Sequence, residues 1–399
     1  MGRLRAGDRL AQVDVIELQV EKLVAGGDGL ARFEGIPIFI PRSAPGDRIR
    51  ARITHRFPDY GRASVVELLE PGPHRREPPC EYFQSCGGCD LQHLEDEVQT
   101  RLKVEAFLET LERLAGVRLA AEPRVISGSP WGYRLRTQLH VNVETRAVGY
   151  LARSSHDLVP VGSCPVLAPE LEQALGELSE RLPEPPPKRV NLAVGDDGGV
   201  TTSPPVEGFP LREVRMRVAG VDYTLMAATF FQGHRELVSD LVDSVVGAWS
   251  GETAVDLYSG VGLFSLALAG RYSRVIAVEG DRPACRLARN NARLNKIGNV
   301  EVEALAVESW IRNLPPDADR VVADPPRAGL SRVVTKKLGE RPPGRLTYVS
   351  CHPAALARDL RQLRRSHAIE SVTLLDLFPQ TGHLEAVVQM VRRNASATS

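Results

Sequence analysis

Apolar residues recur at two different spacings along the chain, and the change of spacing divides it. Residues 10–70 hold five short runs rich in β-branched residues, separated by turns that contain glycine or proline. These runs predict a small OB-like β-barrel, a shape common among RNA-binding domains but also found without a ligand. They cover residues 14–20, 29–33, 36–40, 47–54 and 63–69.

From about residue 226, short apolar strands alternate with helical stretches. This alternation predicts a Rossmann-like α/β domain whose largely parallel sheet is covered on both faces. The predicted strands are residues 254–258, 275–279, 300–304, 320–323, 345–350 and 372–376, and the predicted helices are 263–269 and 282–294.

The segment between these two parts is mixed. A proline- and arginine-rich connector at 71–79 precedes a strongly helical stretch at 91–114, and residues 123–225 alternate strand-like runs with loops. We therefore predict three domains: a barrel at 1–74, a central α+β domain at 75–225 and the α/β domain at 226–399. We expect helix 91–114 to pack against the α/β domain.

The charge balance limits the class of protein. The 399 residues carry 50 Lys and Arg against 50 Asp and Glu, so the formal net charge is zero. This excludes a strongly cationic nucleic-acid binder but allows local basic patches. No apolar signal segment opens the chain, and no apolar run approaches the ~18 residues of a membrane-spanning helix. We expect a cytoplasmic protein that makes no membrane contact.

Six cysteines stand in the chain, and disulfides are not expected in a reducing compartment. Cys80, Cys86 and Cys89 are bunched, which indicates metal or cluster ligation. Cys285 lies in a helical stretch with no supporting motif, so we interpret it as a small buried apolar residue.

A glycine-rich turn follows the first strand of the α/β domain, in the pattern Asp256-x-x-x-Gly260-x-Gly262. Glycines let the backbone approach a ligand there, and Glu279 ends the next strand, where an acid can accept hydrogen bonds from ribose hydroxyls. The dinucleotide fingerprint and a phosphate-binding lysine are both missing from this turn. It therefore favours S-adenosylmethionine over a nicotinamide cofactor, although a tight turn without a ligand is the plainer alternative.

Two further motifs follow apolar strands and so belong to the same edge of the sheet. Asp324-Pro325-Pro326 fits either methylation of an amine or recognition of a base edge. Cys351 favours the second, because an amine needs no thiol, whereas carbon 5 of uracil becomes nucleophilic only after a thiolate adds to carbon 6. Removing the carbon 5 proton then needs a base, for which Glu385 and His383 are the candidates.

Taken together, these motifs resemble those of the RNA uracil-5 methyltransferases, in the branch that carries an iron–sulfur cluster and resembles the enzymes of 23S rRNA. The resemblance spans residues 80 to 385 and extends to the N-terminal barrel, which is similar to a TRAM domain. The matching segments are Cys80-x5-Cys86-Gly-Gly-Cys89, Gly162-Ser-Cys164-Pro, Phe230-Phe231-Gln232, residues 256–264, Asp324-Pro-Pro-Arg-Ala-Gly329, Ser350-Cys351-x-Pro353 and Gly382-His-Leu-Glu385.

The resemblance implies roles for particular residues. It implies that Cys351 is the nucleophile and Glu385 the base. It also implies that Gln232, Tyr258, Gly260, Glu279 and Asp324 line the methyl-donor and uracil pocket. It further implies that Cys80, Cys86, Cys89 and Cys164 hold a [4Fe–4S] cluster, although zinc would accept the same thiolates.

The chain departs from the family at four positions in or near the motifs. His234 and His352 stand where asparagine is usual, Ser259 replaces a frequent cysteine, and Ala306 replaces an acid that contacts adenine in many relatives. Nucleophile and base are intact, so we expect an active enzyme.

Two other functions remain alternatives: an amino methyltransferase that uses Asp324, and a non-catalytic RNA-binding iron–sulfur protein. The expected partner is RNA, with 23S rRNA favoured over the T-loop of tRNA, and we expect a monomer.

Overall fold

The computed structural model of the chain describes residue 10 and residues 14–393. It divides into two compact units. The first comprises Met1–Glu109, Leu151–Val159 and Phe378–His383, and the second comprises Thr110–Tyr150, Pro160–Leu377 and Leu384–Ser399. The three-domain boundaries inferred from the sequence stay a prediction.

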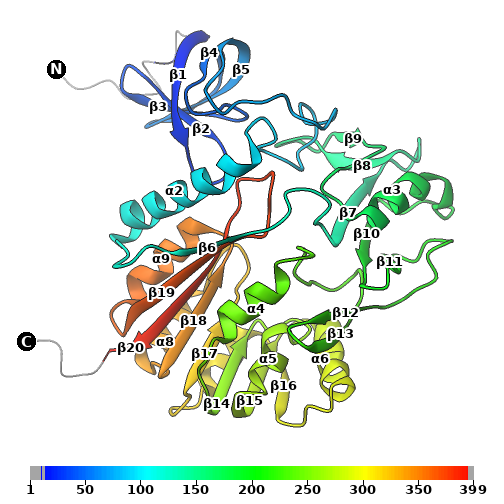
Figure 1. The fold of residues 1–399 in the computed structure, drawn as a ribbon, viewed down its shortest axis with the longest axis vertical. Helices are drawn as coiled ribbons and strands as arrows, with labels where there is room; N and C mark the ends of the chain where they lie inside the picture. The colour runs from blue at the N-terminus through cyan, green and yellow to red at the C-terminus, as the bar shows by residue number, and fades with distance from the viewer. Residues whose placement is uncertain (1–9, 11–13, 394–399) are drawn as a thin grey trace, which may run out of the picture. The chain divides into compact units, whose positions relative to one another are not determined.

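The first unit contains the predicted barrel (Figure 1). Five strands close in the order β1-β2-β3-β5-β4. Alternate residues of β1, such as Ile16, Leu18 and Val20, point into the core while their neighbours stay exposed, as the period of a strand requires. The strands are β1 (Val15–Leu23), β2 (Gly29–Phe33), β3 (Ile36–Ile40), β4 (Arg48–Arg56) and β5 (Gly61–Glu70).

The loop at residues 71–95 follows the barrel and precedes α2 (Asp96–Ala115). The helix begins five residues later than predicted, because Leu91 and Leu94 are joined in a separate turn by a backbone hydrogen bond of 2.9 Å. Since α2 crosses from the first unit into the second, its predicted packing on the α/β domain stays a prediction.

Smaller sheets occupy residues 136–225. Strands β11, β10, β7 and β8 form an antiparallel sheet next to α3, and β12 pairs with β13 in a hairpin. Their bounds are β7 (Arg136–Val141), β8 (Val148–Leu151), β9 (Leu158–Pro160), α3 (Pro169–Arg181), β10 (Arg189–Val194), β11 (Val200–Ser203), β12 (Val214–Val218) and β13 (Val221–Leu225).

An eight-stranded sheet organises the rest of the second unit, in the order β16-β15-β14-β17-β18-β20-β19-β6. All neighbouring pairs are parallel except those of β20, which runs antiparallel to β18 and β19. The strands are β6 (Arg124–Ser127), β14 (Gly251–Leu257), β15 (Tyr272–Glu279), β16 (Val300–Ala304), β17 (Arg320–Ala323), β18 (Arg345–Ser350), β19 (His367–Asp376) and β20 (Glu385–Arg392).

The strand order reverses between β14 and β17. The helices on the two sides of this point cover opposite faces of the sheet. Right-handed crossovers place the helices that follow β14 and β15 on one face, and those that follow β17 and β18 on the other. A ligand crevice is expected at the carboxyl ends of the strands where the order reverses. The helices are α4 (Val238–Val246), α5 (Leu263–Leu268), α6 (Arg282–Leu294), α7 (Val307–Trp310), α8 (Arg332–Glu340) and α9 (Pro353–Leu363), with a 3₁₀ turn at Ile311–Asn313.

The structure confirms the predicted alternation of strands and helices. It adds β6, which joins the far edge of the sheet from about 250 residues upstream of its neighbour β19. No helix within the described residues is long and apolar enough to cross a membrane.

Candidate active site

The glycine-rich turn between β14 and α5 is tightly bent. Tyr258, Gly260 and Gly262 have φ angles of 63°, 54° and 93°. The left-handed conformation costs glycine little, but it is uncommon for a residue such as tyrosine, and strained backbone of this kind gathers at functional sites.

Glu279, at the end of β15, holds this turn in place. One carboxylate oxygen accepts a hydrogen bond of 2.9 Å from the backbone N–H of Gly260, and the other accepts one of 2.7 Å from Asp281. Each oxygen has a second lone-pair direction. The carboxylate therefore keeps capacity for hydroxyl donors of a ligand, and the ribose contact expected of Glu279 stays a prediction.

Asp256 is fully buried beneath the same turn. Ser265 on α5 donates a hydrogen bond of 2.5 Å to its carboxyl group, which ties β14 to the helix. Burial raises the pKa of Asp256 to about 7, and the Ser265 hydrogen bond partly opposes this rise.

Asp324 lies one strand away, immediately after β17. The register pairs Leu257 with Ala323, so the residues that follow, Tyr258 and Asp324, leave the sheet side by side. Gln232 donates a hydrogen bond of 3.3 Å from Nε2 to the Asp324 carboxyl group. Burial, and secondly the nearby charge of Asp256, raise the pKa of Asp324.

Cys351 and Glu385 meet at the end of one strand ladder. Ser350 on β18 pairs with Ala386 on β20, so the next position of this antiparallel pair places Cys351 beside Glu385. Glu385 is buried and Cys351 is half-buried. A thiol and a carboxyl group therefore lie side by side, although 34 residues separate them in the sequence.

The surroundings of this pair disfavour charge. Burial, and secondly the Glu385 carboxylate, raise the pKa of the Cys351 thiol to about 11. Burial and the Asp324 carboxylate raise the pKa of Glu385 well above its ordinary value. The positive charge of Arg327 opposes both shifts.

Arg327 and Glu308 are site residues that the sequence analysis missed. Arg327 stands three positions after Asp324 inside a motif already noted, and that position is the signal that should have indicated it. Glu308, on α7, accepts a hydrogen bond of 3.1 Å from the Tyr258 hydroxyl. It lies two positions after Ala306, so an acid is present close to the position where the resemblance implies one.

The two histidine departures have local structural roles. The Nδ1 atom of His352 accepts a hydrogen bond of 3.1 Å from the N–H of Ala355, which caps the first turn of α9. His234 is buried and stacks on Tyr133, with ring centroids 4.7 Å apart.

The six cysteines are distributed over both units. Cys80, Cys86 and Cys89 belong to the first unit and Cys164 to the second. Across residue 10 and residues 14–393, no group of three or more His, Cys, Asp or Glu side chains is placed to hold a metal ion, so the predicted four-cysteine ligand set is not seen as such. Cys285 is buried, as predicted, and its thiol donates to the Glu279 carbonyl at 3.3 Å.

Arg136, the first residue of β7, lies next to the segment that carries Gln232. It is half-buried and donates hydrogen bonds to the carbonyl oxygens of Phe231 and Ala227. Burial lowers its pKa to about 10. Its guanidinium group therefore supports the Gln232 loop, because Nη1 and Nη2 each donate to a carbonyl oxygen in or next to that loop.

Comparison with known proteins finds that the chain is similar to RNA methyltransferases. A model of the tRNA (Uracil-5-)-methyltransferase family matches residues 212–393, and a TRAM domain model matches residues 9–66. The 23S rRNA (uracil(1939)-C(5))-methyltransferase RlmD of Pectobacterium atrosepticum is 32% identical, over 93% of this chain and 92% of the relative. An RNA methyltransferase of Nostoc sp. is 29% identical, over 95% of this chain and 97% of the relative.

Among solved structures, the Pyrococcus abyssi tRNA (uracil-54, C5)-methyltransferase in complex with S-adenosyl-L-homocysteine resembles the chain with a TM-score of 0.75. The two sequences are 27% identical, and the match covers 94% of this chain and 100% of that structure.

Proposed function

The chain belongs to the RNA uracil-5 methyltransferase family, whose methyl donor is S-adenosylmethionine, and from this premise we propose that it methylates carbon 5 of a uridine in 23S rRNA through a covalent adduct with Cys351. Glu385 is the base of this reaction. The observation that carries the proposal is the register of β18 and β20, which sets Cys351 beside a buried carboxylate.

The glycine-rich turn binds the methyl donor, and the Asp324 loop binds the uracil base. Tyr258, Gly260 and Glu279 hold the methyl donor, whose sulfonium carries an electrophilic methyl group. Asp324 and Gln232, already hydrogen-bonded to each other, orient the base. This arrangement suits an adenosyl ligand that has no phosphate group, because the turn offers a carboxylate acceptor rather than a phosphate-binding cation.

The thiolate of Cys351 adds to carbon 6 of uracil, and the electron pair moves to carbon 5. Carbon 5 then forms a bond to the methyl group, and the bond between that group and sulfur breaks. Glu385 takes the proton from carbon 5, the bond between Cys351 and carbon 6 breaks, and the thiolate returns. A raised pKa makes the Glu385 carboxylate a stronger base once it is ionised.

Ribosomal RNA is the favoured substrate because the relative at 32% identity acts on 23S rRNA and is matched over nearly its full length. The solved structure at 27% identity is a tRNA methyltransferase, so the tRNA T-loop is the alternative. Mapping 5-methyluridine in both RNAs, from cells with and without the protein, distinguishes the two. Loss of the modification from tRNA alone would overturn the rRNA assignment.

Three variants test the two catalytic residues. Cys351→Ala is expected to abolish both methylation and any covalent RNA complex, because no other group can add to carbon 6. Glu385→Gln is expected to accumulate a methylated adduct that survives denaturing electrophoresis, because addition and methyl transfer precede the step that it blocks. Cys285→Ala, which removes a buried thiol outside the proposed chemistry, is the matched control and should turn over normally.

His383 is the competing base, and its variant decides between the candidates. If His383→Ala trapped the adduct while Glu385→Gln turned over normally, the base would be His383. Wild-type protein should form a stable adduct only with 5-fluorouridine RNA, since fluorine cannot leave as a proton.

A [4Fe–4S] cluster held by Cys80, Cys86, Cys89 and Cys164 is a separate part of the proposal. Four thiolates are the usual complement for such a cluster. The backbone N–H of Gly88 donates to the Cys86 sulfur at 3.4 Å, and the positive charge of Arg42 lies close enough to Cys86 and Cys89 to interact with both. Both features would stabilise bound thiolates.

Metal analysis of anaerobically purified protein tests the cluster. We expect about four irons with labile sulfide, as four thiolates imply. Cys86→Ser should lose the iron, whereas Cys285→Ser should keep it. Stoichiometric zinc without sulfide would overturn the cluster assignment and leave the catalytic proposal intact.

A further inference from the structure

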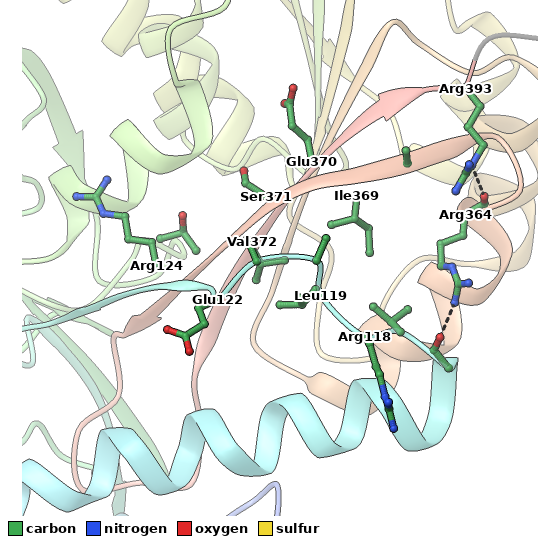
Figure 2. Close-up of a pocket in the computed structure, with 16 residues that line it drawn as sticks. Arg118, Leu119, Glu122, Arg124, Arg364, Ile369, Glu370, Ser371, Val372 and Arg393 are labelled. Carbon is green, nitrogen blue, oxygen red and sulfur yellow. Dashed lines mark hydrogen bonds between the residues drawn. The ribbon is translucent and has the colours of Figure 1, made fainter. Parts of the chain in front are cut away.

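A pocket of about 560 Å³ lies in the second unit, beside β19 and the segment that leads into β6 (Figure 2). Its floor is apolar and includes Leu119, Ile369 and Val372. Strand β6 pairs with β19 only from Thr373 to Asp376, so the earlier residues of β19 form an open edge of the sheet within the described part of the chain.

Four arginines surround this pocket. Figure 2 shows Arg364 and Arg393 close together at one end and Arg124 at the other, with Arg118 along the segment that closes the pocket. Two acids, Glu122 and Glu370, also line it, and Glu370 forms an ion pair of 2.8 Å with Arg345, which lies outside the pocket. Four arginines against two acids leave the pocket positively charged in a chain whose net charge is zero.

Hydrogen bonds to the backbone hold two of these charges in place. Arg364 donates to the carbonyl oxygens of Ala115 and Gly116 at 2.8 and 3.2 Å, and Arg393 donates to those of Arg364 and His367 at 3.0 and 3.1 Å. A guanidinium group has five N–H donors, so each keeps some for a ligand. Fixed cations lose little conformational freedom when an anion binds.

The other two arginines are accessible. Arg124 is exposed, and the Arg118 side chain is 83% exposed and pairs with Glu112. An exposed ion pair contributes at most about 1 kcal/mol, so a phosphate can replace Glu112 at low cost. Arginine is also the side chain whose geometry best matches phosphate oxygens.

The pocket extends away from the catalytic pair along the sheet. Leu375 on β19 pairs with Glu385, and Ile369 is six residues earlier on the same strand. At ~3.3 Å per residue, the end of the pocket beside Ile369 is roughly 20 Å along the strand from Leu375. Arg124 pairs with Thr373, two residues before Leu375, so the other end is nearer to the catalytic pair. An RNA that places its uridine at Cys351 reaches the far end only if it continues for roughly 20 Å.

We propose that this basic pocket binds the phosphate backbone of the substrate RNA at a second contact, whose far end lies roughly 20 Å along the sheet from the catalytic pair. The proposal rests on RNA being the substrate, which membership of the family supplies, and it does not depend on the assignment of Cys351 or Glu385.

The test compares two RNAs that share the target uridine, one long enough to reach the pocket and one limited to a minimal stem-loop. Replacing Arg118 by alanine should raise the KM for the long RNA several-fold and leave its kcat unchanged. The slope of log affinity against log salt should fall by about one, for the one lost phosphate contact. The minimal stem-loop should show neither change.

Arg293→Ala is the matched control, because Arg293 is an exposed arginine on α6, away from the residues that line the pocket. Arg118→Lys keeps the charge and should retain most of the affinity, whereas a folding defect would affect both RNAs alike. Equal losses on the two RNAs, an equal loss in Arg293→Ala, or unchanged RNA affinity with binding of an acidic peptide instead would each overturn the proposal. If wild-type protein made no 5-methyluridine at all, the proposed function would fail instead.

Discussion

Burial disfavours the charged forms of both the Cys351 and the Glu385 side chains. The thiol with a pKa of about 11 is almost fully protonated at neutral pH, and burial raises the pKa of the Glu385 carboxyl group well above its ordinary value. The thiolate is the reactive form, so the groups that stabilise it matter as much as the sulfur itself. Arg327 is the cation that lowers the pKa of both groups.

The alkylation of Cys351 by iodoacetamide should therefore keep accelerating with pH up to about 11, rather than levelling off near the ordinary thiol value of 9.0. Arg327→Ala removes the charge that favours the thiolate, so the pKa should rise further. Alkylation at pH 8 should then slow by a few-fold, since each pKa unit corresponds to about a tenfold change in thiolate. Peptide-resolved mass spectrometry separates Cys351 from the other five cysteines.

Arg327→Lys is the conservative partner and should preserve most of the rate. An alkylation rate that is the same in Arg327→Ala and wild type would show that Arg327 does not act on this thiol.

The loop Phe378–His383 shows how one element determines the position of the next. It belongs to the first unit, and β20 begins with Glu385 only two residues after it. Gln99 and Gln380 exchange two hydrogen bonds, of 2.9 Å between their side chains and 3.1 Å from the Gln380 backbone N–H. Asp90 accepts a further hydrogen bond of 3.2 Å from the N–H of Gly382.

Gly382 leaves no room for a side chain. A Cβ atom there would lie 2.3 Å from backbone atoms of Gly26 and Gly27, in the turn between β1 and β2. The barrel and α2 together therefore fix the path of the loop that leads to the proposed base.

Gln99→Ala removes both hydrogen bonds to Gln380, so the loop should gain freedom and hold Glu385 less accurately. We expect kcat to fall about tenfold, since small displacements of a catalytic group cost up to about a hundredfold. The methylated adduct should build up, because proton removal becomes the slow step, while the KM for RNA stays constant.

Glu97→Ala, an exposed change two residues earlier on α2, is the control and should behave like wild type. An unchanged level of adduct in Gln99→Ala would show that the loop does not position the base.

At the scale of the whole molecule, the catalytic residues and the barrel belong to different units. The residues proposed for chemistry and donor binding all lie in the second unit, and the barrel lies in the first. The barrel carries a cluster of partly exposed aromatic rings at the β4–β5 turn. Phe57 stacks on Tyr60 with ring centroids 4.4 Å apart, and Phe39 meets Tyr60 edge to face at 5.4 Å.

Nucleic-acid bases stack on such rings, each contributing about 1–3 kcal/mol. Replacing Phe57 and Tyr60 by alanine should weaken RNA binding at least fivefold and raise KM, while kcat stays constant because the chemistry lies in the other unit. Filter binding and steady-state kinetics measure the two effects. Val66→Ala removes exposed apolar surface elsewhere on the barrel and should change neither; an equal loss there would exclude base stacking as the cause.

The sequence alone determined the local elements and the class of enzyme. The period of apolar residues predicts the five barrel strands and the alternating strands and helices, because side-chain period follows directly from local backbone geometry. The motifs at the carboxyl ends of strands predict a methyltransferase of uracil in RNA, and membership of the family confirms that class. Chemistry limits which side chains suit each step, so residue types near strand ends are informative.

Only the tertiary structure decided which of these residues meet. The pairing of Ser350 with Ala386, the hydrogen bond from Gln232 to Asp324 and the entry of β6 into the sheet join segments that lie far apart in the chain. The influence of Arg327 on Cys351 and the arginine pocket beside β19 arise in the same way. The physical reason is that register and burial are set by long-range pairing, which no local pattern of residues encodes.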